Sequence, residues 1–182
     1  VLVQLVDAGY SATTNASGQY SMVNVLPDNY TISFSKYGYV THTQAIVLAE
    51  DQELTVNASL VPMATVNVTG TILASDTMAG INGAAIQLNG YANYTANSNA
   101  TGAFTVPGVY ANQTYSYIII APGYSSATGS INVAATNYAM GSITLSEIAF
   151  APGGVTAELN GPQTEANITW LAPDPNALEI TE

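Results

Sequence analysis

The chain contains no cysteine, and charged residues of either sign are scarce. Only 7% of its 182 residues are charged, where about 25% is usual in soluble domains. Without cysteine, no disulfide bond can hold the fold together. This is more typical of a bacterial or archaeal surface protein than of a small secreted animal domain, where cross-links often compensate for a thin core.

Basic residues are almost absent. Lys36 is the only lysine or arginine, against 12 acidic residues, and the formal net charge is −11. A protein that binds nucleic acid must bring lysine and arginine to the phosphates to release their counterions. The composition therefore excludes nucleic acid as a partner.

The residue types that build catalytic and metal sites are equally rare. His42 is the only histidine, and without cysteine or a second histidine it cannot form a catalytic dyad or a zinc site, so we interpret it as a solvated strand residue. The acidic run 50–53 lacks the spacing of a calcium loop, and the other acids lie in turns or near the termini rather than as a facing pair. We expect no enzyme activity, no metal and no cofactor.

Long apolar runs are missing although 48% of the residues are hydrophobic. That apolar content excludes a disordered chain, and the lack of an 18-residue apolar run predicts no membrane span. No secretory signal is visible, and the chain starts within a repeated pattern, so we expect a mature product or a piece of a longer chain.

Alternation of apolar and polar residues is frequent, whereas helical periodicity is not found. The segments 30–35, 54–60 and 66–69 alternate as half-buried strands do. Turns rich in Gly, Pro, Asn and Asp separate such segments at intervals of about 8 to 12 residues, which is typical of an antiparallel β-sandwich.

The segment 115–120 departs from this alternation. If Tyr115, Tyr117 and Ile119 face the core, then Ile118 and Ile120 face outward. Two exposed isoleucines on one strand favour a contact between domains or between chains.

One pattern occurs twice along the chain. The copies are 83 residues apart at Leu5 and Leu88 and 85 residues apart at Leu60 and Leu145. A strand-like run at 65–72 precedes the second copy, and nothing equivalent precedes Val1. The sequence therefore predicts that the first copy lacks its opening strand.

The second copy carries the motifs Gly70-Thr71-Ile72, Gly83-Ala84-Ala85-Ile86-Gln87-Leu88, Asn99-Ala100-Thr101-Gly102-Ala103-Phe104 and Gly123-Tyr124. By these motifs and their counterparts in the first copy, each copy resembles the carboxypeptidase regulatory-like (transthyretin-like, seven-stranded) β-sandwich family. The family usually has Asp where Asn15 and Asn99 stand. The resemblance implies an all-β fold of tandem seven-stranded antiparallel Greek-key sandwiches, the first without its N-terminal strand, plus C-terminal strands.

The expected domains are 1–62, 63–149 and 150–182. In the last of these, the segments 155–159 and 166–173 resemble the first two strands of a fibronectin type III domain, with Ala166, Ile168 and Trp170 inward and Pro173 closing the second strand. Two strands cannot close a sandwich, so we expect their apolar residues to need cover from elsewhere.

Asparagine is often followed two residues later by serine or threonine. Eight N-glycosylation sequons occur, at Asn15, Asn29, Asn57, Asn67, Asn93, Asn99, Asn112 and Asn167. Covalent glycans would supply the polar coat that so few charges cannot. The alternative is that strand alternation places Asn and Thr two residues apart on a wet face.

These features favour a structural subunit or segment of an extracellular filament or stalk on a prokaryotic cell surface, which self-associates head to tail by β-strand complementation. The alternative is a set of accessory modules of a larger secreted enzyme or adhesin, and a carbohydrate-binding role is a third, weaker possibility. The expected interface residues are Val1, Val3, Leu5, Ile118, Ile120, Val155, Leu159, Ile168 and Trp170.

Overall fold

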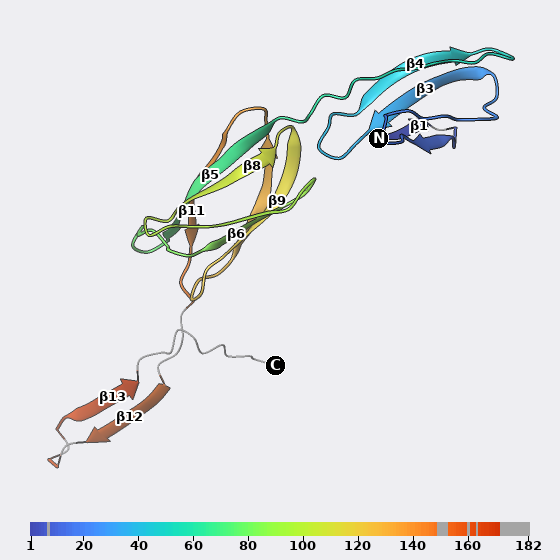
Figure 1. The fold of residues 1–182 in the computed structure, drawn as a ribbon. Coiled ribbons are helices and arrows are strands. Elements are labelled where there is room, and N and C mark those ends of the chain that lie inside the picture. The colour runs from blue at the N-terminus through green and yellow to red at the C-terminus, as the bar shows by residue number, and fades with distance from the viewer. Residues whose placement is uncertain (7, 149–152, 160, 163, 172–182) are drawn as a thin grey trace. The chain divides into compact units, whose positions relative to one another are not determined.

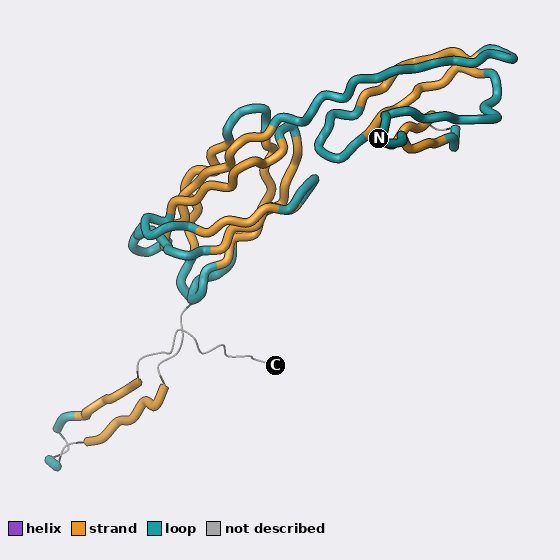
Figure 2. Tube along the Cα trace, in the orientation of Figure 1, coloured by secondary structure: helices purple, strands orange, loops and turns teal. Residues whose placement is uncertain are grey.

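The structure is a computed structural model that describes residues 1–6, 8–148, 153–159, 161–162 and 164–171. These residues form 13 β-strands and no helix (Figures 1 and 2). The predicted all-β class is thus confirmed. Among the described residues, no helix is long and apolar enough to cross a membrane. The chain divides into two compact units, unit 1 (Val1–Ala64) and unit 2 (Thr65–Glu182).

Unit 2 contains a complete seven-stranded sandwich. Its first sheet has the order β10-β9-β6-β7, formed by Ala127–Val133, Gln113–Ile120, Ala85–Asn89 and Tyr94–Asn97. Its second sheet has the order β11-β5-β8, formed by Tyr138–Leu145, Thr65–Ala74 and Ala103–Tyr110. The central strand of the second sheet, β5, therefore pairs on both sides.

The sheets of the sandwich enclose one apolar core. Alternate residues of each strand point into it, including the fully buried Val68, Ile72, Ile86, Leu88 and Tyr115. On β9 the inward residues are Tyr115, Tyr117 and Ile119, as the sequence predicts, while Ile120 is exposed and Ile118 is half-buried. The alternation therefore reports correctly which face each side chain takes.

The pairing in the sandwich differs from the expected all-antiparallel arrangement at one place. Strand β11 runs parallel to β5, from Tyr138 beside Val68 to Leu145 beside Ala74. Strand β10 belongs to the other sheet, so the chain crosses between the sheets before β11 and then runs beside β5 in the same direction. Parallel neighbours need a long connection between them, because a tight hairpin joins only antiparallel strands. The expectation of purely antiparallel pairing was wrong for this pair.

Unit 1 contains one four-stranded antiparallel sheet with the order β2-β1-β3-β4. Its strands are Leu2–Leu5 (β1), Ser11–Thr13 (β2), Asp28–Ser35 (β3) and His42–Leu48 (β4). The order repeats that of β7-β6-β9-β10 in unit 2. Val3, Leu5, Ile32 and Phe34 form its buried core.

The segments of unit 1 that correspond to β8 and β11 are not strands. Residues 18–27 and 52–61 carry no strand assignment, and Figure 2 draws them as loops. The prediction of a strand over 54–60 was therefore wrong. The reason is local: in unit 2 both flanking strands pair with β5, and no segment of unit 1 lies in that central position.

The C-terminal part of the described chain is an antiparallel hairpin. Strands β12 (Gly153–Leu159) and β13 (Ala166–Leu171) pair with Thr156 opposite Thr169. The two predicted strands are present, and the side chains of Val155, Leu159, Ile168 and Trp170 are 57–64% exposed. Pro173 and the rest of 172–182 lie outside the described residues.

Candidate strand-binding groove

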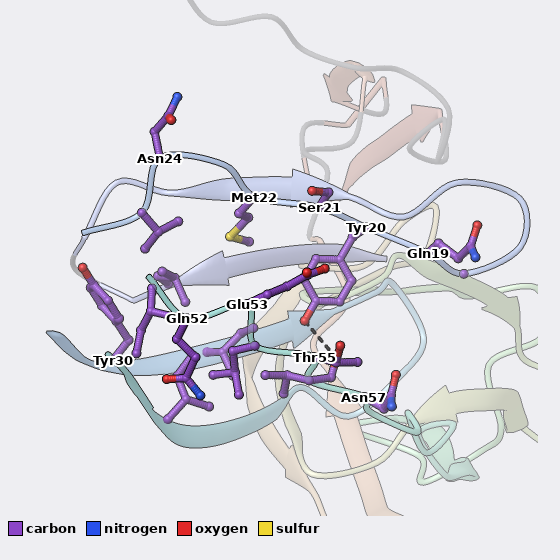
Figure 3. Close-up of a pocket in the computed structure, with 18 of the residues that line it drawn as sticks. Gln19, Tyr20, Ser21, Met22, Asn24, Tyr30, Gln52, Glu53, Thr55 and Asn57 are labelled. Carbon is purple, nitrogen blue, oxygen red and sulfur yellow. Dashed lines mark hydrogen bonds between the residues drawn. The ribbon is translucent and has the colours of Figure 1, made fainter. Parts of the chain in front are cut away.

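An open cavity of about 710 Å³ lies over the inner face of the unit 1 sheet (Figure 3). Its floor includes Leu5, Ile32 and Ile46. The first wall is the segment 17–25, and the second wall is the segment 52–57. This space between two unpaired walls is called the groove below.

The groove occupies the position that β5 fills in unit 2. There, β8 and β11 lie on either side of β5, and by the repeat they correspond to the two walls: Phe104 of β8 matches Tyr20, and Leu145 of β11 matches Leu60. The groove therefore has the place, the neighbours and the apolar floor of a missing central strand.

Two equivalent glycines give an independent measure of this vacancy. Gly102 in unit 2 and Gly18 in unit 1 close the same turn, with φ of +78° and +81°. A methyl group on Gly102 would overlap the carbonyl oxygen of Ile72 on β5, whereas one on Gly18 would find no atom within 4 Å. Strand β5 covers the turn in unit 2, and nothing covers it in unit 1.

Tyr20 joins the two walls across the groove. Its hydroxyl donates a hydrogen bond to the carbonyl oxygen of Val56 at 2.9 Å, drawn as a dashed line in Figure 3. Its ring packs edge to face on Phe34, with centroids 5.8 Å apart. Burial raises the pKa of the Tyr20 hydroxyl, because the phenolate would lose its solvation.

Two further tyrosines hold the first wall by its backbone. Tyr10 donates to the carbonyl oxygen of Asn24 at 3.3 Å, and Tyr30 donates to that of Leu26 at 2.8 Å. The tyrosine hydroxyls thus donate to backbone carbonyl oxygens in segments that have no β-ladder. The backbone N–H groups of an incoming strand could replace these hydroxyls as donors without opening the core.

Comparison with known proteins finds a match to one family in the first part of the chain. Residues 1–61 match the carboxypeptidase regulatory-like domain. The match covers the part of the chain that forms the single sheet and the groove, and it agrees with the resemblance in the sequence. The fibronectin type III resemblance of the C-terminal strands is not confirmed. No curated protein matches the chain.

Solved structures similar to the chain include surface filament proteins. The shaft pilin SpaA from Lactobacillus rhamnosus GG has 13% identity and a TM-score of 0.40, over 79% of this chain and 70% of that one. The minor pilin GBS52 from Streptococcus agalactiae has 15% identity and a TM-score of 0.45, over 78% and 69%. A putative carbohydrate binding protein from Bacteroides uniformis has 18% identity and a TM-score of 0.40, over 54% and 49%. Similarity at this level transfers no function to this chain.

The residues expected at an interface fall into two groups. Val3 and Leu5 are buried in unit 1, and Leu5 also lines the groove, while Val1 is half-buried beside that core. The others lie on outer surfaces: Ile118 is half-buried and Ile120 is 45% exposed on β9, and the four residues of the hairpin are more exposed still.

The sequence analysis missed the residues that shape the groove walls. Tyr20, Met22, Val25 and Val56 pack against the unit 1 core and line the groove. The signal that could have found them was the repeat itself, since Val106 and Val109, the counterparts of Met22 and Val25, are core residues of unit 2. Apolar residues that flank a missing strand mark its binding site.

All eight sequon asparagines are exposed. Two of them also have a structural role. The Oδ1 atom of Asn99 accepts hydrogen bonds from the backbone N–H groups of Thr101 and Ala103 at 2.9 and 3.1 Å. Asn15 does the same for Ser17 and Gln19 at 2.9 and 3.0 Å. The carbonyl oxygen of the side chain therefore shapes both turns, and in the first turn Nδ2 of Asn15 also donates to Oε1 of Gln19 at 3.2 Å.

The His, Asp and Glu side chains form no candidate metal site in the described part of the chain. His42 is exposed on β4, with its ring 6.1 Å from that of Phe34. No group of three or more His, Cys, Asp or Glu side chains among the described residues could hold a metal ion. The groove is thus the feature of this structure best suited to bind a partner.

Proposed function

We propose that the chain is a structural subunit or segment of an extracellular filament or stalk on a prokaryotic surface, assembled head to tail by β-strand complementation. The observation that carries the proposal is the vacant β5 position in unit 1. A strand from another copy that entered the groove could pair with both walls and cover the apolar floor. Main-chain hydrogen bonds would supply affinity, and alternate side chains would supply specificity.

The free energy of unit 1 favours the binding of such a strand. A unit of about 60 residues buries only about 60% of the surface of its unfolded chain, so the loss of a central strand leaves little reserve. An inserted strand adds apolar burial at roughly 25 cal/mol per Å² and a row of main-chain hydrogen bonds. Because donor and acceptor are different surfaces, the contact does not close on itself and propagates as a fibre.

The proposal includes N-linked glycans on the exposed sequons. With 7% charged residues, the surface gains little hydration from ionic groups, and covalent glycans would provide it. Intact mass measurement of native material tests this part: we expect a mass above the 18.8 kDa of the polypeptide. A mass equal to that of the polypeptide would remove the glycans from the proposal and leave the assembly untouched.

The assembly is tested by closing the groove. In the variant Gly18→Ala, the new methyl group finds open space in the free unit but would overlap a strand that entered as β5 does beside Gly102. We expect the 182-residue chain to form filaments in electron micrographs and the Gly18→Ala variant to remain monomeric by sedimentation.

Gly9→Ala is the matched control. Gly9 has a φ of +74° and open space beyond its Cα, like Gly18, but it does not line the groove. It therefore carries the same backbone penalty and should leave assembly intact. Monomers of the unmodified chain at every concentration would overturn the filament and favour the alternative, accessory modules of a larger secreted enzyme or adhesin.

A further inference from the structure

We propose that β12 (Gly153–Leu159) of a second copy of this chain is the strand that fills the groove. This inference rests on the proposed function and deepens it by identifying the donor. Both β12 and β13 are strands with apolar side chains exposed on the hairpin, so the choice between them depends on the shape that the groove requires.

The shape of the required strand can be taken from β5. Val68, Gly70 and Ile72 follow one another along its inward face. Only the smallest residues fit there, because even a methyl group on Gly70 would lie 2.7 Å from Cε1 of the Phe104 ring, and the ring would have to shift to admit it. Inward residues along this stretch must therefore be large, small and large in turn.

Unit 1 imposes the same requirement. Tyr20 corresponds to Phe104, and its ring is held in place by Phe34 and by the hydrogen bond to Val56. A donor strand must therefore pass Tyr20 with a small residue. Its neighbours two positions away on either side can be large, because they point to the apolar floor of Leu5, Ile32 and Ile46.

Strand β12 has this order of sizes and β13 does not. On β12, Val155, Ala157 and Leu159 share one face, and their order of sizes follows that of Val68, Gly70 and Ile72, with one methyl group more at Ala157 than at Gly70. The opposite face of β12 carries Thr156 and Glu158, as that of β5 carries Thr69 and Thr71. On β13 the order is small, large and large, so Ile168, between Ala166 and Trp170, would meet the Tyr20 ring.

Strand β12 is also easily released from its present partner. Its sheet has only two strands, and its pairing with β13 is irregular between Gly153 and Thr156. An isolated two-stranded hairpin is marginally stable in water. Val155 is 58% exposed and Leu159 is 64% exposed, so insertion would bury surface that the hairpin leaves wet.

The fit fixes a register that can be measured. In unit 2, Thr69 of β5 lies opposite Thr105 of β8 in an antiparallel pair. Thr156 takes the position of Thr69, and Ser21 is the unit 1 counterpart of Thr105. The proposal thus places Thr156 of one copy opposite Ser21 of the next, close enough for a disulfide if both are replaced by cysteine.

The test is a pair of double variants, Ser21→Cys with Thr156→Cys and Ser21→Cys with Thr169→Cys. The chain has no cysteine of its own, so no other disulfide competes. Thr156 and Thr169 face each other in the hairpin, with their hydroxyl oxygens 2.7 Å apart, so each variant removes the same contact. On mild oxidation of assembled protein, we expect a ladder of covalent oligomers with Thr156→Cys and monomers with Thr169→Cys.

The other possible results show whether the choice of β12 as the donor strand is wrong or the filament assembly itself is wrong. A ladder only with Thr169→Cys, a cross-link within one chain, or filaments without either cross-link would each overturn β12 as the donor while the filament stands. Absence of filaments from the unmodified chain would overturn the proposed function itself.

A second pair of variants tests the size rule without cysteine. Ala157 is exposed in the hairpin, which should tolerate any side chain there. We expect Ala157→Leu to raise the concentration needed for assembly by roughly ten-fold or more, since overpacking at a filled position is strongly unfavourable, and Ala157→Gly to leave it within about two-fold. Equal behaviour of the two variants would contradict the insertion of Ala157 opposite Tyr20.

Discussion

At the level of single residues, Asn15 and Asn99 show how one side chain can meet two requirements. Each stands where the related family usually has Asp, and each uses Oδ1 to accept two backbone N–H groups in its turn. An aspartate oxygen would accept the same bonds. The turn therefore explains the need for an oxygen acceptor, and the sequon is an additional property of the amide.

Substitutions at Asn99 separate these two properties. Asn99→Asp removes the sequon and keeps the acceptor, so we expect little change in the stability of unit 2. Asn99→Ala removes both and leaves the N–H groups of Thr101 and Ala103 without this partner, which should lower the free energy of unfolding by about 1–3 kcal/mol. Urea denaturation measures the difference, and equal losses in the two variants would contradict the role of Oδ1.

The equivalent glycines Gly18 and Gly102 should differ in their tolerance of alanine. Both have positive φ, so either substitution costs about 1–2 kcal/mol in backbone strain. In Gly102→Ala the methyl group also overlaps Ile72 of β5, which adds about 1–3 kcal/mol of overpacking. Thermal unfolding of each unit, followed by its own amide signals, should show the larger loss for Gly102→Ala. A similar loss at both sites would mean that the groove is not open.

At the level of strands, alternation predicted the elements that have partners. The predicted segment 30–35 lies within β3, and 66–69 lies within β5. The segment 54–60 alternates equally well and is not a strand. Alternation records which face a side chain takes, whereas a strand also requires a neighbour to pair with its backbone.

The groove could be predicted in part for the same reason. The repeat located the vacant position, because β5 fills its counterpart in unit 2. The repeat did not predict whether the walls are strands or loops. That depends on contacts that no local pattern encodes, such as the hydrogen bond from Tyr20 to Val56. The order β2-β1-β3-β4 is likewise a property of the whole sheet.

The bond between the walls predicts a dependence on pH. Burial raises the pKa of Tyr20 above its unfolded value of about 10. The neutral hydroxyl is therefore favoured in the folded state, and its contribution is fully present below pH of about 10 and lost as the pH rises through the folded pKa. Tyr20→Phe should be less stable than the unmodified protein by about 1 kcal/mol below that pH.

Above that pH, the stability of unit 1 in the unmodified protein should fall toward that of Tyr20→Phe, because a phenolate cannot donate to the Val56 carbonyl oxygen. The amide signals of unit 1 report its unfolding, and the Tyr20→Phe chain serves as its own control for alkaline effects elsewhere. Two curves that stay parallel from neutral to alkaline pH would contradict this role of Tyr20.

At the level of the whole molecule, the two units share the order of one four-stranded sheet, but their apolar cores differ greatly in size. In the described residues, 18 buried apolar side chains form the core of unit 2, and 4 form that of unit 1. The difference follows from the central strand, since β5 alone contributes Val66, Val68, Ile72 and Ala74 and holds β8 and β11 in a sheet. We therefore expect unit 1 to gain more stability than unit 2 from the proposed partner strand.

This asymmetry predicts two separate thermal transitions, with unit 1 unfolding first. At protein concentrations below those needed for assembly, a synthetic peptide with the sequence of 153–159 should raise the lower transition and leave the upper one unchanged, because the sandwich of unit 2 already contains β5. A ligand that binds only the folded state at about 100 times its dissociation constant stabilises it by about 2.7 kcal/mol. The control peptide replaces Ala157 by Leu, and it should have a much smaller effect because its larger side chain meets Tyr20. Calorimetry of the Gly18→Ala chain should show no response to either peptide, and an equal rise in that chain would place the peptide outside the groove.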